Sequence, residues 1–425
     1  MESRSELRRT VGLGALTVYA TGDILGAGIY ALVGKVAGAA GGGAWLSFVV
    51  AAGVALISGL TYAELSSRYP LAAGASAYCR RAFAPPVVGF LAGIFVLASG
   101  VTSAAAVSRA FVGYLDTFII VPPLMASLSL LVLMTALNFW GIKESVRVNL
   151  FLTGVEILGL LFVVGAGLWY ASTLPAGTLG GRIELPLDPF DILTGATIAF
   201  FAYIGFEDTV NLAEEVHDPA RVLPRAILIA VVVTTLIYVA VCVVALWTVP
   251  LATLAGSPTP LIEVVIAAGV YLPTGVFSAI ALCAICNTGL LNLIMVSRLG
   301  YGMAREGLLP DVFGRVHSVR RTPHVSVAAA FVLAALLALS GDTRVLAQTT
   351  SFLLLCVFTA LHVGLLVIKR GVAAPAGVFQ TPAWTPAIGV LLCAGLCTQY
   401  PIEVYVRAGI VLAGGLALYV WLGRR

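Results

Sequence analysis

Charge is scarce in this sequence. Only 10% of its 425 residues are Asp, Glu, Lys or Arg, whereas 60% are hydrophobic. Soluble domains carry about 25% charged and about 45–50% apolar residues. A soluble fold of this size could not cover its apolar surface with so few charges. The composition therefore argues against a soluble enzyme and against a protein that binds nucleic acid.

Side chains that carry covalent or metal chemistry are also few. The chain has four His and seven Cys residues. Cys283 and Cys286 have CxxC spacing, but no His or second Cys pair stands near them, so small buried side chains are the better interpretation. We find no nucleophile–base pair, no His-rich metal set and no phosphate-binding loop of an ATPase. The sequence thus predicts no enzyme, no metal site and no cofactor.

Long apolar runs are what the sequence has. A membrane-spanning helix needs about 20 apolar residues, so the hydrophobic share supplies roughly a dozen. Ten regular spans fall in the charge-free stretches 36–63, 82–108, 117–142, 157–181, 226–262, 264–297, 322–341, 345–368, 371–402 and 408–423. Two further apolar segments, the first and the sixth in order, are interrupted by charge. We predict an all-α integral membrane protein with twelve transmembrane helices.

Basic residues predict the orientation. With the N-terminus inside, 18 of the 24 Lys and Arg residues fall on the cytoplasmic side. Such an asymmetry follows the positive-inside rule. We expect a multi-pass protein of the plasma membrane with both termini cytoplasmic, which agrees with an even number of spans.

The two interrupted segments predict an internal symmetry. The first contains Asp23 and a Gly-Ala-Gly run, and the second, 192–206, ends at Glu207. Interrupted spans at corresponding positions of two halves are a pointer to a transporter binding site. We therefore predict a five-plus-five inverted repeat with discontinuous helices 1 and 6. The first repeat would take residues 1–172, the second 188–370, and helices 11 and 12 would lie in 371–425.

The broken segments suit a zwitterionic ligand. Gly26, Ala27 and Gly28 let a ligand approach the backbone, and the half-helix that begins there can bind a carboxylate through its N–H groups. Unwound carbonyls around Phe201, Ala202 and the residues up to Gly205 can accept from an ammonium group. The alternative for the glycines is a small-residue face for helix packing.

Five stretches resemble the amino acid–polyamine–organocation (APC) superfamily. They read ATGDILGAGIYALVGKVAG, YAELSSRYPLAAGASAYCRRAF, NFWGIKESVRVNLFLTGVEILGLL, FFAYIGFEDTVNLAEEVHDPARVLPRAI and SRLGYGMAREGLLP, in chain order. The resemblance implies the five-plus-five fold, alternating access around a central site and the activity of an amino acid permease.

The resemblance also implies a set of substrate contacts. The substrate carboxylate would meet the N–H groups of Gly26, Ala27 and Gly28. The ammonium group would meet the carbonyls of Ile24, Phe201 and Ile204. Phe201 stands where family members often place an aromatic ring that closes over the substrate; packing against lipid or core is its alternative.

Carboxylates at membrane depth are candidates for coupling or gating. Ionisable residues within spans are expensive and usually face a cavity or a partner. Asp23, Glu156 and Glu207 are the three that we single out, each with the alternative of a hydrogen-bonded carboxyl that only joins helices. The resemblance places Glu156 where many proton-coupled members carry a lysine and where sodium-coupled relatives of the fold hold a cation. Asn287 is a weaker candidate for the same pocket.

These features together predict a secondary transporter that moves amino acids by symport, with H⁺ favoured over Na⁺ as the coupling ion. The small-molecule substrate and the lipid bilayer are its expected partners. One alternative is a cation-coupled or exchange transporter of polyamines or other organic amines, although a polyamine would not need the Gly-Ala-Gly backbone. A more distant alternative is a non-transporting membrane receptor.

Overall fold

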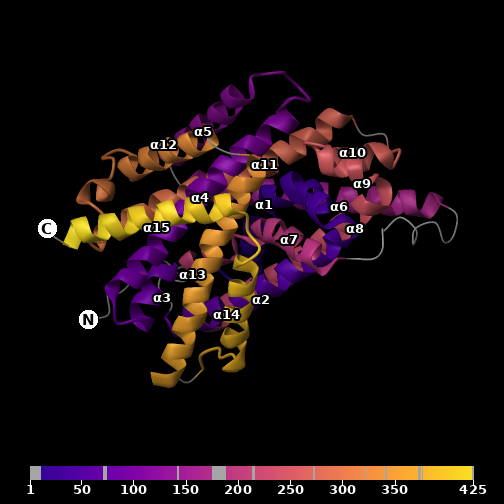
Figure 1. Cartoon of the computed structure of the whole chain (residues 1–425). Coiled ribbons are helices and arrows are strands. Elements are labelled where there is room, and N and C mark those ends of the chain that lie inside the picture. Colours follow the sequence, from indigo (N-terminus) through magenta and orange to yellow (C-terminus); the bar gives the residue numbers. More distant parts are fainter. Residues whose placement is uncertain are drawn as a thin grey trace.

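A computed structural model describes residues 11–69, 74–140, 143–174, 188–212, 216–270, 273–320, 322–339, 342–371, 375 and 377–423. These residues form a bundle of helices (Figure 1). Over the ranges described there is no β-strand, and a single isolated bridge pairs Val11 with Val216. The prediction of an all-α protein is confirmed.

The helices follow the order of the apolar runs. They are α1 (Leu13–Ala40), α2 (Ala44–Arg68), α3 (Gly74–Ala82), α4 (Pro86–Leu115), α5 (Pro123–Trp140), α6 (Lys143–Thr173), α7 (Pro189–Ala199), α8 (Pro219–Thr248), α9 (Leu251–Gly256), α10 (Pro260–Ala267), α11 (Thr274–Arg305), α12 (His324–Leu339), α13 (Thr343–Gly371), α14 (Trp384–Cys397) and α15 (Ile402–Gly423). Short 3₁₀ helices are η1 (Gly41–Gly43), η3 (Phe200–Tyr203), η4 (Phe206–Leu212) and η5 (Asp311–Gly314).

Nine helical runs within the described residues are long and apolar enough to cross a membrane. The first run, Leu13–Arg68, contains both α1 and α2, which have 28 and 25 residues and so are each long enough to span. Two shorter apolar helices, α12 and α14, accompany them. The charge-free run 371–402 ends where Pro401 separates two helices, because α14 ends at Cys397 and α15 begins at Ile402.

Proline starts many of these helices. Pro86, Pro123, Pro189, Pro219 and Pro260 are the first residues of α4, α5, α7, α8 and α10. Proline suits this position because its φ is already helical and its missing N–H has no partner to lose in the first turn. The starts of these five helices are therefore specified by a local feature of the sequence.

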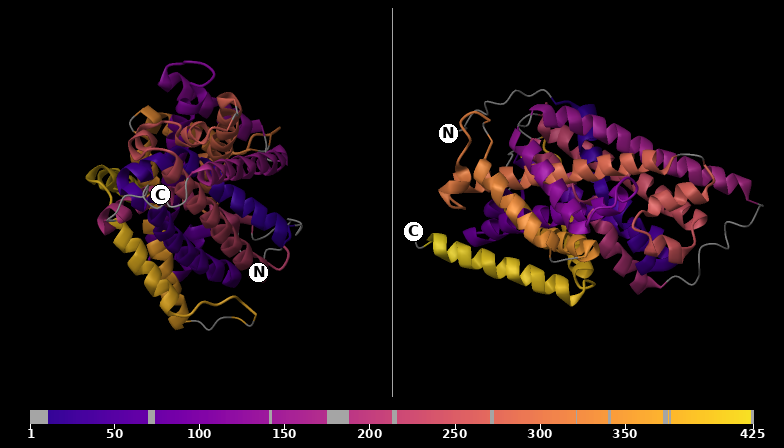
Figure 2. Two further views of the ribbon diagram at one scale, coloured as in Figure 1. Left: turned by 90° about the vertical axis from the view of Figure 1, so that its right-hand side faces the viewer. Right: turned by 90° about the horizontal axis from the view of Figure 1, so that it is seen from above.

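Helix α1 lies at the centre of the bundle. It packs against α6, α7, α8 and α11, and most of its residues are buried (Figure 1). The last helix, α15, lies along the outside in the right-hand view of Figure 2 and buries three residues, Val404, Ala408 and Gly415. Large apolar side chains are exposed on several outer helices. Such a surface suits a bilayer rather than water.

Both predicted helix interruptions are present. In α1 the backbone leaves the helical region at Gly26, with φ −10° and ψ −160°. In the sixth segment α7 passes into η3, Ile204 is extended, and Gly205 has a φ of 131° before η4 begins. The two irregular stretches pack against each other in the middle of the bundle. They define the candidate site.

Candidate substrate site

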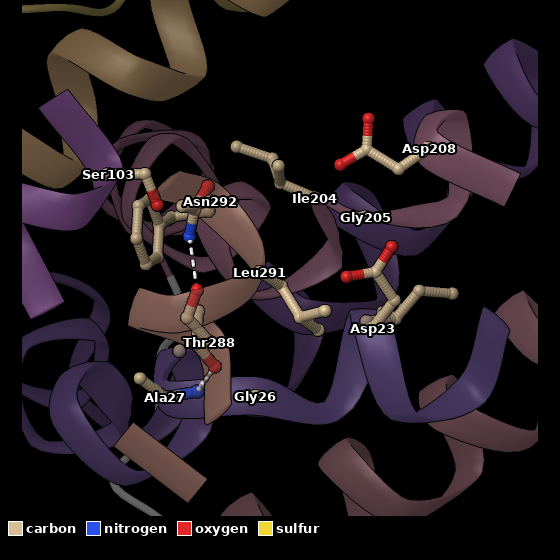
Figure 3. A pocket seen from close by; sticks show the side chains of 13 residues that line it. Asp23, Gly26, Ala27, Ser103, Ile204, Gly205, Asp208, Thr288, Leu291 and Asn292 are labelled. Atoms are coloured by element: carbon tan, nitrogen blue, oxygen red, sulfur yellow. Dashed lines mark hydrogen bonds between the residues drawn. The ribbon is translucent and has the colours of Figure 1, made fainter. Parts of the chain in front are cut away.

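A pocket lies where the two interrupted segments meet (Figure 3). The first segment, the sixth segment, α4 and α11 all contribute to its walls. Its lining residues are Asp23, Ile24, Gly26, Ala27, Gly28, Ser103, Phe201, Ile204, Gly205, Asp208, Thr288, Leu291 and Asn292. Backbone of non-helical shape is tolerated at membrane depth when protein or a water-filled cavity satisfies it. The pocket thus accounts for the position of both breaks.

Glycine permits the close approach of the two segments. A Cβ atom on Gly28 would lie 2.5 Å from the Cα of Ala202, well inside van der Waals contact. A Cβ on Gly205 would lie 2.7 Å from the backbone oxygen of Asp23, and the positive φ of Gly205 further favours glycine. The two backbones therefore touch directly, without side chains between them.

Tyr238 of α8 joins the same two segments by hydrogen bonding. Its hydroxyl oxygen lies 2.7 Å from the carbonyl oxygen of Ile24 and 2.9 Å from that of Ala202. Tyr238 is fully buried, and its ring packs edge-on against Tyr203. One hydroxyl proton thus serves a carbonyl from each broken helix.

Backbone N–H groups and α11 form one side of the pocket. The N–H of Ala27 donates to the Thr288 Oγ1 at 2.8 Å, and the Asn292 side-chain amide donates to the Thr288 carbonyl at 2.9 Å. Gly26 leaves no room beside Thr288, because a Cβ there would lie 2.1 Å from the same hydroxyl oxygen. A ligand carboxylate that reached the N–H groups of the break would take the place that the Thr288 hydroxyl now fills.

Carboxylates form another side of the pocket. Asp23 and Asp208 both line it, and in Figure 3 their carboxylates lie on the side away from Ala27 and Thr288. The buried Asp23 Oδ2 has no hydrogen-bond partner within the described part of the chain. Asp208 and Glu207 lie close enough to Asp23 for their carboxylates to repel its negative charge. This side is strongly acidic.

Glu207 has a different position. Its side chain is 7% exposed, and its Oε2 accepts a hydrogen bond from the N–H of Gly205 at 2.9 Å. Gly205 lies two residues earlier, in the break of the sixth segment. The Glu207 carboxylate therefore satisfies a backbone donor that the interruption leaves without a helical partner.

Glu156 lies in a second polar region, where α6 packs on α1 and α11. Its side chain is completely buried, and neither carboxyl oxygen has a hydrogen-bond partner among the residues described. The Tyr30 hydroxyl donates to the backbone carbonyl of Glu156 at 3.2 Å. One turn earlier, the buried Thr153 hydroxyl packs against Gly22, where a Cβ would lie 2.1 Å from it. Because Tyr30 and Gly22 both belong to α1, this region contacts the helix that contains the first interruption.

Comparison with known proteins identifies the family. A family model described as amino acid permease matches residues 11–403. The chain belongs to the amino acid permease family. Members of this family are multi-pass membrane transporters, not enzymes, and the resemblance drawn from the five sequence stretches is confirmed.

Three relatives illustrate the range of named substrates. The branched-chain amino acid permease of Bacillus subtilis is 27% identical, over 99% of this chain and 94% of its own length. The chloroplastic cationic amino acid transporter 9 of Arabidopsis thaliana is 32% identical, over 74% of this chain and 58% of its own length. The methylthioribose transporter of Bacillus subtilis is 27% identical, over 99% of this chain and 93% of its own length.

Most of the residues that we expected at the permease's substrate site lie in one place. The pocket lining includes Ile24, Gly26, Ala27, Gly28, Phe201 and Ile204. Ala202 lies behind Gly28 instead, with its carbonyl facing Tyr238. Two of the expected ammonium acceptors already have hydrogen-bond donors: Tyr238 donates to the Ile24 carbonyl, and the N–H of Ile204 lies 3.3 Å from the Phe201 carbonyl.

The expected coupling residues divide between regions. Asp23 lines the pocket, Glu207 holds the break of the sixth segment, and Glu156 lies away from the lining. Asn287 is 1% exposed, and its Oδ1 accepts from the Asn149 Nδ2 at 3.2 Å. This hydrogen bond joins α11 to α6, the helix that carries Glu156. Asn287 therefore belongs with the region of Glu156 rather than with the pocket lining.

Sequence reasoning missed several lining residues. Ser103, Asp208, Thr288, Leu291 and Asn292 line the pocket, and Tyr238 lies directly behind it. Asp208 carries a signal that could have been used, because it is a second acid at membrane depth beside Glu207. The others come from α4, α8 and α11, where a single polar residue or one more leucine in an apolar helix gives no local sign of what it faces.

Proposed function

We propose that this permease moves amino acids across the plasma membrane by alternating access, coupled to protons. The observation that carries the proposal is the pocket at the junction of two interrupted helices, with the Ala27 N–H and the Thr288 hydroxyl that accepts from it on one side and carboxylates on another. A carboxylate binds favourably where N–H groups begin a half-helix. An ammonium group is complementary to carbonyls and acids. The two sides together suit an amino acid.

The proposal includes a topology. We assign twelve spans by counting α1 and α2 separately and by adding α12 and α14 to the long helical runs. The inverted repeats are assigned to 1–172 and 188–370, with 371–425 appended and both termini cytoplasmic. The support is that the two interruptions occur in the first and sixth spans and contact each other.

Glu156 is our proposed coupling residue. Its buried carboxyl has two oxygens without partners in the described residues, and its backbone carbonyl accepts from the Tyr30 hydroxyl of the broken first helix. A charge buried without a partner is costly, so the region is most stable when a proton or a cation is bound. A single proton satisfies a carboxyl without additional ligands, which favours H⁺ over Na⁺. Asp23 and Glu207 are proposed to link binding to movement of the two half-helices.

Exchange or cation-coupled transport of organic amines is the second candidate. The specific observation in its favour is the acidic side of the pocket formed by Asp23 and Asp208. A polyamine would use that side and leave the N–H groups of the first break without a ligand. Uptake assays separate the two candidates directly.

The experiment is uptake by the purified permease in proteoliposomes. Labelled amino acids and amines are supplied while a pH gradient and a sodium gradient are imposed separately. We expect amino acid uptake that responds to the pH gradient. Transport of amines alone would favour the second candidate, and the absence of both flux and exchange for every compound would overturn the transporter assignment of the pocket.

Replacing Glu156 tests the coupling. Glu156→Gln keeps the shape of the side chain but removes the group that gains and loses a proton. We expect uptake driven by the pH gradient to fall at least tenfold, while exchange of substrate across the membrane continues. Unchanged pH and sodium dependence in this variant would exclude Glu156 as the coupling residue.

A further inference from the structure

We propose that the end of α5, where α11 and the loop before α12 meet it, binds the phosphate headgroup of an anionic phospholipid, with Arg298 and Arg320 as its ligands. Both arginines are exposed, and neither lines the substrate pocket. The proposed ligand is a component of the bilayer rather than a substrate. The inference therefore goes beyond the proposed function and does not depend on it.

The last turn of α5 is held in place by its neighbours. The Asn138 side-chain amide donates to the Leu293 carbonyl at 3.1 Å and to the Ser297 hydroxyl at 3.2 Å, both in α11. From the loop before α12, the Thr322 hydroxyl donates to the Phe139 carbonyl at 3.2 Å. The helices α5, α11 and α12 also pack on one another (Figure 1). Three segments that are far apart in the sequence therefore meet at this end of α5.

Arg320 is positioned over an exposed aromatic ring. Its guanidinium carbon lies 5.3 Å from the centroid of the Trp140 ring, and Trp140 is 60% exposed. The loop is fixed there, because the N–H of Arg320 donates to the His317 Nδ1 at 3.2 Å and the His317 ring packs edge-on against Phe139. A guanidinium that stacks by its face can still use the N–H groups at its edge for a bidentate contact. Phosphate oxygens match that geometry.

Arg298 is a second exposed cation beside the same turn of α5. It follows Ser297, which accepts from Asn138, and lies seven residues before the end of α11 at Arg305. With 32 residues α11 is about 48 Å long. If it is centred, about 9 Å extends beyond each side of a hydrocarbon core of about 30 Å. Arg298, about 10 Å from the helix end, therefore lies near the boundary between acyl chains and phosphate groups.

The described part of the chain supplies no ion-pair partner for either arginine. None of its ion pairs involves Arg298 or Arg320. Two acids, Glu306 and Asp311, lie between them in the sequence; Glu306 is paired with Arg80 at 2.7 Å, and Asp311 lies in η5. Basic sites between spans near the membrane surface suit phospholipid headgroups. Charge and depth together favour an anionic lipid over a zwitterionic one.

A pair of lipids tests the inference on the purified wild-type permease. Phosphatidylglycerol and phosphatidylcholine with the same acyl chains differ in the charge of the headgroup, and native mass spectrometry in detergent counts the lipid bound at each concentration. We expect phosphatidylglycerol to bind at least fivefold more tightly. Inorganic phosphate at the same concentrations should not displace it. Equal binding of the two lipids, or displacement by inorganic phosphate, would overturn the inference.

Arginine variants assign the binding to this place. Arg298→Gln and Arg320→Gln each remove one charge, and we expect the preference for phosphatidylglycerol to fall at least threefold in either variant. Arg225→Gln is the matched control and should keep the wild-type preference. Arg225 is also exposed and lies six residues inside its helix, since α8 begins at Pro219, so it carries the same charge at a similar depth. Equal losses in all three variants would indicate general attraction to basic residues and reject the site.

The outcomes are independent of the proposed function, because lipid binding is measured without transport. Amino acid uptake by a permease that shows no lipid preference would reject this inference alone. A lipid preference that depends on Arg298 and Arg320 would support it even if the pocket carried another substrate. Should one arginine variant not fold, the other, compared with Arg225→Gln, still assigns the site.

Discussion

At the scale of single residues, the site depends on the absence of side chains as much as on their presence. Gly28 and Gly205 bring the two broken helices into backbone contact, and Tyr238 fastens the junction from α8. Small residues allow such approaches between helices in a membrane. Their replacement should change the site without altering the rest of the bundle.

Gly28→Ala is the most direct test at this scale. The new Cβ would lie 2.5 Å from the Cα of Ala202, so the two segments must move apart. We expect uptake to fall at least tenfold while the protein still inserts and elutes as a monodisperse species. Gly53→Ala in α2 is the matched control, because a Cβ there has no heavy atom within 4 Å, and it should retain uptake. Normal uptake by Gly28→Ala would argue against a tight junction at this point.

The residues of the site were predictable from sequence in part. Gly26, Ala27, Gly28 and Asp23 could be found because a glycine-rich, charged interruption stands out in an apolar run. Tyr238 could not, because a tyrosine inside an apolar helix gives no sign of its hydrogen-bond acceptors. Those acceptors are carbonyls of residues 24 and 202, which come close only in the folded chain.

At the scale of elements, a buried charge network connects helices of different parts of the chain. Glu64 of α2 is completely buried and accepts from Arg68 at 2.7 Å, from the Lys369 Nζ of α13 at 2.8 Å and from the N–H of Thr381 at 2.8 Å. Ser67 extends the network, since it donates to the Ala220 carbonyl of α8 and accepts from the Phe379 N–H. Phe379 and Thr381, which precede α14, are thereby fixed to α2 and, through Ser67, to α8.

Glu64→Gln tests this network. The substitution keeps the size of the side chain but leaves Arg68 and Lys369 without their shared carboxylate. Loss of one member of a buried pair costs about 3–5 kcal/mol, so we expect a lower midpoint of thermal unfolding in detergent.

The exposed pair of Arg80 and Glu306 supplies the control, with side chains 43% and 45% exposed. Surface pairs contribute about 0–1 kcal/mol, so Arg80→Gln should leave the midpoint nearly unchanged. Equal effects of the two substitutions would show that burial of Glu64 does not matter to stability.

The order of the elements and both interruptions were predicted, but helix bounds were predicted only coarsely: the charge-free run 226–262, for example, corresponds to α8 at Pro219–Thr248. Proline marks the starts of several helices, and charge or glycine marks both interruptions. The network of Glu64 was not predicted. Glu64 lies in sequence among Tyr, Ala and Ser residues at a span end, where a solvated carboxylate is expected, and its burial results from the loop around Thr381 that folds over it.

At the scale of the whole molecule, the exposed apolar surface and the buried centre agree with a protein whose solvent is lipid on its outer faces. The predicted spans were charge-free runs, and the long helices correspond to such runs. The helices α12 and α14 are shorter, with 16 and 14 residues, so their assignment as spans is less direct. The inverted symmetry and the orientation depend on relations between distant segments and remain predictions.

Accessibility labelling tests the orientation. Ile120, between α4 and α5, and Val319, between α11 and α12, are 93% and 80% exposed, and the distribution of basic residues assigns them to opposite sides of the membrane. We expect a membrane-impermeant maleimide to label Ile120→Cys on intact cells and Val319→Cys only after permeabilisation. Wild-type protein gives the background from native cysteines. The reverse pattern would invert the assigned topology.

The shared hydroxyl of Tyr238 has a consequence for the energetics of opening. A hydroxyl has one proton, so it makes one strong hydrogen bond even when two acceptors are within reach. If the first broken helix moves away, the proton can turn fully to the Ala202 carbonyl; if the sixth moves, it can turn to Ile24. Separation of the two helices therefore leaves the number of donated bonds unchanged. The hydroxyl itself therefore does not oppose the separation through the loss of a donated bond, and the cost falls on the carbonyl that is left behind.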